Sequence, residues 1–156
     1  MLRISKLTDY GTMILVHLAG QENGLNSASD VAAGTRLALP TVQKLLKLLA
    51  RSGLVHSVRG AGGGYKLART PASISAAEIL DALEGPLSIT ECSTADSRCE
   101  LEDGCPVGGA WQKINRGIHG ALNEITLAEL AHPPHEFQLA DLYNQAGRLR
   151  HRLQST

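Results

Sequence analysis

The sequence predicts a mainly α fold that carries one small β-hairpin, and three observations lead to this expectation. Hydrophobic residues make up 43% of the 156-residue chain but aromatic residues only 3%, so a core must be built from aliphatic side chains, a composition that favours helices. Apolar residues also recur at helical spacing in several separate stretches. Finally, two short runs of strand-forming residues flank a glycine-rich stretch at residues 59–64.

The first helix is expected to begin at Ser5 or Thr8, since either side chain can cap it, and to run to about Gly20. Its apolar residues at helical spacing are Leu7, Tyr10, Ile14, Leu15 and Leu18. A short helix over residues 28–34 should follow. Ser27 stands just before it, and Asp30 follows Ser27 at capping-box spacing, with aspartate in place of the usual glutamate or glutamine.

The next helix is expected to start with Pro40 at its first position and to be capped by Gly53. Its apolar stripe consists of Val42, Leu45, Leu46 and Leu49. A different face carries Lys44, Lys47 and Arg51, with Thr41 and Gln43 near the start of the helix. A short helix, a tight turn and a second helix with a basic face predict a helix-turn-helix over about residues 28–51. The alternative is an ordinary helical hairpin with a solvated lysine face.

A β-hairpin is predicted directly behind this pair of helices, at about residues 54–69. Its strands are residues 54–58 and 65–69, and its tip is the glycine-rich stretch. The three elements together make a winged helix-turn-helix unit over residues 1–85. Glycines let a backbone approach a phosphate closely, and Arg59 suits the negative potential of a DNA minor groove. A nucleotide phosphate loop is excluded, because no Gly-Lys-Ser/Thr follows and the run precedes a strand.

The distribution of charge separates the two halves of the chain. The formal net charge is zero, but residues 1–70 carry nine basic and three acidic side chains, a balance of +6, which leaves −6 for the remainder. This asymmetry predicts that only the first half meets a polyanion such as DNA. The alternative is simple solvated surface charge.

All three cysteines lie in one segment, residues 86–108, which follows a helix expected over residues 76–84 with Ser75 as its cap. Cys92, Cys99 and Cys105 are separated by six and five residues. Thiolates gathered on one loop suit an iron–sulfur cluster, zinc or copper(I). The tight Cys-x2-Cys pairs typical of zinc sites do not occur, which ranks a cluster above zinc. Three ordinary thiols, or one disulfide and a spare thiol, remain the alternatives.

A long helix is predicted within residues 109–131, where apolar side chains recur over some four turns. They are Trp111, Ile114, Ile118, Leu122 and Ile125. A helix with one apolar stripe outside a compact unit predicts dimerisation through the same helix of a second subunit, whereas the alternative is an ordinary core helix. Residues 132–156 are expected to form a tail.

Several classes of protein are disfavoured by the sequence. It has no signal sequence at its start and no apolar run of the roughly 20 residues that a membrane span needs, so a cytoplasmic protein without membrane contact is expected. An enzyme with a cysteine nucleophile is also disfavoured. No histidine or carboxylate has a recognisable catalytic relation to any of the three thiols.

The assembled motifs resemble those of the bacterial winged-helix regulators that include IscR and NsrR, which sense iron–sulfur clusters, nitric oxide or redox state. The likeness covers about residues 1–130 and is most specific at residues 53–55, at residues 57–65, and in the three-cysteine loop followed by a tryptophan-bearing helix. Within that family the chain looks most like the regulators of the SUF iron–sulfur assembly operon. The resemblance implies a transcription regulator of such genes. A winged-helix regulator with a thiol redox switch or zinc site is the alternative.

The resemblance also implies a homodimer that binds a palindromic promoter site in double-stranded DNA. Each protomer would hold one cluster, 2Fe–2S or 4Fe–4S, on Cys92, Cys99 and Cys105. Thr41, Gln43 and Lys44 would face the major groove and Arg59 the minor groove. The full set of expected DNA-binding residues is Pro40, Thr41, Gln43, Lys44, Lys47, Arg51, Ser57, Arg59, Gly62 and Gly63.

Two positions depart from the IscR pattern. Gln43 replaces a glutamate that repels some bases, so the choice of DNA sites is expected to differ. Gly108 replaces the histidine that supplies the fourth cluster ligand. Thr8-Asp9 instead matches the motif with which NsrR supplies an aspartate from the partner subunit, although Asp9 also suits the positive end of a helix dipole. The other candidates for the fourth ligand are Glu91, Asp96, Asp103 and His119.

Overall fold

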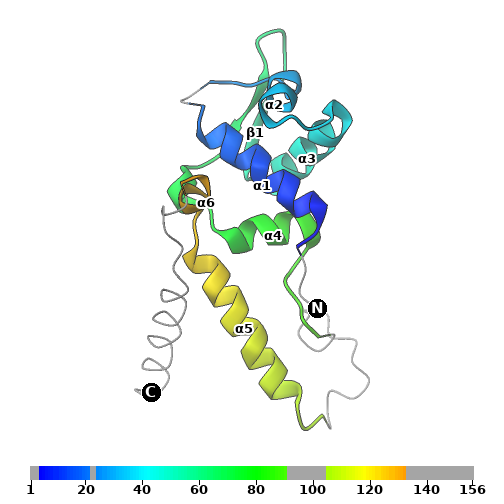
Figure 1. Cartoon of the computed structure of the whole chain (residues 1–156), viewed down its shortest axis with the longest axis vertical. Coiled ribbons are helices and arrows are strands. Elements are labelled where there is room, and N and C mark those ends of the chain that lie inside the picture. The colour runs from blue at the N-terminus through cyan, green and yellow to red at the C-terminus, as the bar shows by residue number, and fades with distance from the viewer. Residues whose placement is uncertain (1–3, 22–23, 91–104, 133–156) are drawn as a thin grey trace.

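The computed structural model of the protein describes residues 4–21, 24–90 and 105–132 (Figure 1). Over these residues the fold is mainly α with one antiparallel hairpin, which confirms the predicted fold class. All the described elements except α5 gather in one compact unit, which we call the head, and the long helix α5 projects from it (Figure 1). The helices are α1 Lys6–Ala19, α2 Ala28–Thr35, α3 Leu39–Arg51, α4 Ala76–Glu84, α5 Gly108–Glu124 and α6 Leu127–Ala131; the strands are β1 Val55–Val58 and β2 Gly64–Leu67, and η1 Pro71–Ser73 is a 3-10 turn.

Helix α1 lies at the centre of the head and contacts α2, α3, α4, α6 and β2. Of the two caps considered from the sequence, Ser5 is the one used, because its side chain accepts hydrogen bonds from the backbone N–H groups of Leu7 and Thr8. Ile14, Leu15 and Leu18 are buried as their spacing predicts. These three side chains form the middle of the hydrophobic core.

The helix-turn-helix pair forms at residues 28–51 with small shifts at its ends. The capping box of Ser27 and Asp30 is present, and α2 continues one residue beyond the expected end, to Thr35. Helix α3 starts at Leu39, so Pro40 takes the second position rather than the first. Its cap is Ser52 rather than Gly53, which instead takes the next position with a φ of 77°, the left-handed conformation that glycine adopts after a helix.

The wing is a two-stranded hairpin that is also tied to the rest of the head. Val55 pairs with Leu67 and Val58 with Gly64. At the end of the hairpin away from its tip, both strands are therefore shorter than expected. Asn26, in the turn before α2, forms an isolated bridge with Tyr65, with N–O distances of 2.8 and 3.0 Å. A Cβ at Gly64 would lie 2.7 Å from the Asn26 carbonyl oxygen, so only glycine allows this approach.

The chain returns to the head after α5, a feature that the sequence pattern does not indicate. Ile125 fits the apolar spacing of α5 but lies beyond its last residue, and its carbonyl accepts a hydrogen bond from Ala76 N at 2.8 Å. Leu127 N donates to the Ile74 carbonyl, also at 2.8 Å. The short helix α6 then places Leu127 in the core, fully buried. The base of α5 is therefore fixed to the head.

In the part of the chain that the structure describes, no helix is both long and apolar enough to cross a membrane.

The burial of Leu127 gives a test of the anchoring role of α6. Leu127→Ala should lower the free energy of unfolding by about 2–5 kcal/mol, because it leaves a cavity in the core. Leu130→Ala, in the same helix but 38% exposed, is the matched control and should change stability little. Urea unfolding at one fixed protein concentration measures both. Equal effects of the two substitutions would contradict the anchoring role.

Candidate nucleic-acid interface and cysteine segment

The outward face of α3 brings most of the predicted DNA-binding residues together. A shallow groove of about 330 Å³ runs along it, lined by Pro40, Gln43, Lys44, Lys47, Leu48 and Arg51. The opposite face is fixed in the core by the buried Val42, Leu45, Leu46 and Leu49. This burial sets the rotation of the helix about its axis, so Gln43, Lys44 and Lys47 point outward and are exposed.

The electrostatics of α3 suit an anionic partner. Lys44, Lys47 and Arg51 are the charged residues of its sequence, and all three are basic. The positive end of the helix dipole lies at Leu39, beside Pro40 and Thr41. A helix with this charge pattern can place its first turn against base edges while its flank meets phosphates.

The glycine-rich tip of the wing contains glycines with different roles. Gly60 has a φ of 116°, which favours glycine, and a Cβ at Gly63 would overlap the Val58 carbonyl oxygen. Both are therefore required by the turn itself. A Cβ at Gly62 would meet no atom within 4 Å, so the turn itself does not require glycine at this position. Arg59 and Ser57 are exposed, and the tip lies at the end of the head remote from α5 (Figure 1).

Of the three cysteines, Cys105 lies within the described residues, whereas Cys92 and Cys99 lie outside them, as do Glu91, Asp96 and Asp103. Cys105 is half-buried and stands just before α5, where its carbonyl accepts a hydrogen bond from Gly108 N at 3.4 Å. A Cβ at Gly108 would lie 3.7 Å from the Cys105 sulfur. Glycine at this position therefore places no side-chain carbon against the thiol. No group of three or more metal-ligating side chains is gathered among the described residues.

The first residues of the cysteine segment are held between α4 and α5 by side-chain hydrogen bonds. Asn115 of α5 donates to the Leu87 carbonyl at 3.1 Å and accepts from Ile89 N at 3.2 Å. Asp81 of α4 accepts from Leu87 N at 3.2 Å. One side chain from each helix thus fixes the backbone just before the cysteines.

His119, a candidate fourth ligand, is engaged elsewhere. Its Nε2 lies 3.5 Å from an Asp81 carboxylate oxygen and its Nδ1 lies 2.9 Å from the side-chain nitrogen of Asn123. It follows Gly108 by eleven residues in the same helix, which corresponds to about 16 Å of helical rise. His119 is therefore too far along α5 to join Cys105 of its own chain at one metal site.

Asp9 is exposed in the first turn of α1, beside a junction with α4 that the sequence does not predict. Glu84, at the end of α4, accepts hydrogen bonds from the buried Thr8 hydroxyl and from Ser5 N, the latter at 3.1 Å. A Cβ at Gly11 would overlap Leu83, so α1 and α4 pack closely here. The root of the cysteine segment is therefore joined to the start of α1.

The hydrogen bonds from Thr8 and Ser5 hold the pKa of Glu84 below its usual 4.5.

Comparison with known proteins places this arrangement in a family. A family model named Rrf2, described as an iron-dependent transcriptional regulator, matches residues 4–133. The chain belongs to the Rrf2 family. It is therefore a DNA-binding transcriptional regulator rather than an enzyme. Helices α2 and α3 occupy the place of the predicted helix-turn-helix.

Individual Rrf2 relatives support this assignment over most of the chain. The regulator IscR of Serratia proteamaculans is 33% identical over 132 residues, which are 85% of this chain and 79% of that protein. The structure of CymR, the global cysteine regulator of B. subtilis, is 32% identical with a TM-score of 0.64, and the match covers 84% of this chain and 97% of that one. The structure of T. potens IscR is 31% identical with a TM-score of 0.61, and the match covers 91% and 97% of the two chains.

Substitutions of Gln43 and Lys47 on α3 should have separable effects on DNA binding. Gln43→Ala should lower the discrimination at one base position of each half-site by about 1–3 kcal/mol, because an amide side chain can bond an adenine edge at two points. Lys47→Ala, which removes a charge predicted to meet a phosphate, should weaken binding to all sequences alike. Competition binding with single-base variants of a selected duplex measures both. An equal loss on every duplex for Gln43→Ala would contradict its assignment to base readout.

The Glu84 junction should make stability depend on pH in one direction. Because the pKa of Glu84 is lower in the folded chain than its usual 4.5, the junction stabilises the fold above that pH and is lost as the pH falls through the lowered pKa. Glu84→Gln should therefore be less stable than the parent at neutral pH, and the difference should vanish in acid. Urea unfolding across the acid range tests this. Glu124→Gln, at the exposed end of α5, is the control, and a constant difference for Glu84→Gln would contradict the junction.

Proposed function

We propose that this Rrf2 regulator is a homodimer that binds a palindromic promoter site and senses an iron–sulfur cluster or the redox state of the cell. Cys92, Cys99 and Cys105 would hold the cluster. The observation that carries the proposal is the clamp formed by Asn115, because it fixes the entry to the cysteine segment alongside the helix that begins next to Cys105.

Two distances from this clamp are similar: the rise along α5 from Asn115 back to Gly108, and the reach of the chain from Ile89 to Cys92. Asn115 follows Gly108 by seven residues, which is about 10 Å of helical rise. Cys92 follows Ile89 by three residues, and three extended residues span about 10 Å. In Figure 1 the chain beyond α4 runs along α5 toward the start of that helix. The chain is therefore long enough for the Cys92 thiol to reach the level of Cys105.

The donor set fits such a group. Thiolates are the ligands that iron–sulfur clusters use, and the positive end of the α5 dipole favours negative charge close to Cys105. Gly108 places no side-chain carbon against the Cys105 thiol, which supports a ligand that comes from elsewhere. When bound, the cluster supplies a group that responds to redox state and to small reactive molecules. The proposal covers both a 2Fe–2S and a 4Fe–4S cluster.

Asp9 of the partner subunit is our candidate for the fourth ligand. Its side chain is exposed, and among the described residues none hydrogen-bonds to its carboxylate. An oxygen ligand binds iron less firmly than a thiolate does, which would make the site labile and suited to sensing.

The surface of α5 supports dimerisation. None of its residues is buried within the chain, and Trp111 and Ile114 on its apolar stripe are 41% and 45% exposed. Ile118 and Leu122 continue the same stripe. A contiguous apolar face of this kind is typical of a contact between subunits, and pairing with the same helix of a second copy would cover both faces at once.

The contacts around the cysteine segment support a route from the cluster to DNA. The segment is attached to α4 and α5 through Asp81 and Asn115, α4 is attached to α1 through Glu84, and α1 packs on α3. Ordering the segment around a cluster would fix how each head sits on its α5. This placement would set the separation of the two α3 helices, which must match successive major grooves.

The regulated genes that we propose are those for iron–sulfur cluster assembly, as the resemblance to SUF operon regulators and the IscR relatives suggest. The similarity to CymR, which is also known in an oxidized form from Staphylococcus aureus, favours a second candidate function, a regulator that uses its cysteines as a thiol redox switch. A zinc site is the remaining form of this alternative.

Anaerobic reconstitution followed by native mass spectrometry tests the proposal in one measurement. We expect a dimer that carries one cluster per protomer, with DNA affinity that differs between the cluster-bound and cluster-free forms at one salt concentration. Asp9→Asn should shorten the lifetime of the cluster, whereas Glu124→Gln, which removes an exposed carboxylate elsewhere, should not.

The possible failures are distinct. Zinc without iron and sulfide, or a colourless protein whose DNA affinity follows thiol oxidation, would support the second candidate instead. An unchanged cluster lifetime in Asp9→Asn would remove only the proposed fourth ligand.

A further inference from the structure

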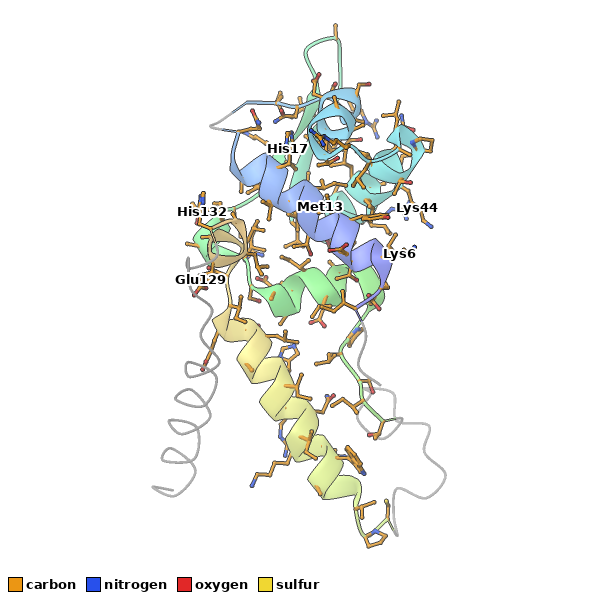
Figure 2. The ribbon with its side chains drawn as sticks, in the orientation of Figure 1. Lys6, Met13, His17, Lys44, Glu129 and His132 are labelled. Carbon is orange, nitrogen blue, oxygen red and sulfur yellow. The ribbon has the colours of Figure 1, made fainter. Side chains whose placement is uncertain are left out.

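A second hollow, of about 390 Å³, lies between α1 and α3, and we call it the α1–α3 hollow. It shares Pro40 and Lys44 with the groove along α3, so the two depressions meet at the start of that helix. Lys6 of α1 and Lys44 of α3 emerge on the same side of the head (Figure 2). The hollow is lined by Lys6, Leu7, Tyr10, Pro40, Thr41 and Lys44.

The lining combines two kinds of surface. Leu7, Tyr10 and Pro40 provide apolar surface, while two ammonium groups from different helices stand at the same hollow. The ion pairs among the described residues are Arg69–Glu78 and His119–Asp81, so neither Lys6 nor Lys44 forms an ion pair with a carboxylate in that part of the chain. Two like charges that border one hollow favour an anion between them.

A nucleic-acid backbone has the matching chemistry, because each unit joins an apolar deoxyribose face to an anionic phosphate. We infer that the α1–α3 hollow is a DNA-backbone site in which Lys6 and Lys44 hold a phosphate and the apolar lining contacts the neighbouring sugar. The inference rests on the proposed role of α3 in the major groove. When the first turn of α3 faces base edges, a hollow beside that turn faces the edge of the groove, where the phosphates lie.

The site would give α1 two functions in its first two turns. Ser5 and Thr8 bond Glu84 at the root of the cysteine segment, and Lys6 and Tyr10 border the DNA. Lys6 would add to this phosphate contact a positive charge that comes from outside the helix-turn-helix. It sets the register of the head on the duplex without reading its sequence.

Salt dependence of DNA binding by the full-length chain tests the inference. Each phosphate contact contributes about 0.9 to the slope of log affinity against log salt, so Lys6→Ala should make the slope of a dimer less steep by about two. The loss should be the same on a selected and on an unrelated duplex. Lys6→Arg should keep the parental slope, because it retains the charge.

Lys113→Ala is the matched control, since this exposed lysine lies on α5 opposite the apolar stripe, and its slope should equal that of the parent. Urea unfolding confirms that each variant is folded. An unchanged slope for Lys6→Ala, or a change in base preference in place of the slope, would overturn the inference and leave the proposed function standing. A parent protein that binds no DNA would overturn both.

Discussion

The backbone hydrogen bonds that join Ile74 and Ala76 to Ile125 and Leu127 are the constraint on which the rest of the structure depends. They bring together two points of the chain on either side of α4, the cysteine segment and α5. Leu127 fills the core beside Ile74, so the return of the chain is held by burial as well as by hydrogen bonds. The three cysteines proposed to hold the cluster lie inside this closed excursion, whereas Asp9 and all the residues proposed to contact DNA lie outside it.

The local parts of the fold were predictable because each depends on a few neighbouring residues. The capping box at Ser27, the cap at Ser75, the apolar stripe of α3 and the glycine-rich tip each depend on local sequence, and all appear within about two residues of their expected places. Helix α6 was missed because five residues are too few for a periodic signal. Ile125 fitted the stripe of α5, but the hydrogen bond from Ala76, which no local pattern reveals, takes it out of the helix.

The candidate site divides in the same way. Residue type and position on one helix were enough to bring Gln43, Lys44 and Lys47 together on α3. The contributions of Lys6 and Glu84 depend on how α1 meets α3 and α4, so they could not be read from spacing. For His119, the sequence left a possible ligand, whereas its contacts with Asp81 and Asn123 and its distance along α5 assign it a structural role.

The bridge between Asn26 and Tyr65 has a consequence for regulation. It ties the wing to the turn before α2, and Gly64 lets the two backbones approach closely, so this contact opposes an independent tilt of the hairpin. Within one head, this bridge therefore couples the two elements proposed to contact DNA. In the proposed dimer, regulation would therefore act on the position of one head relative to the other. The same molecular state could then favour promoters of one half-site spacing and disfavour those of another, so that the spacing decides the sign of the response.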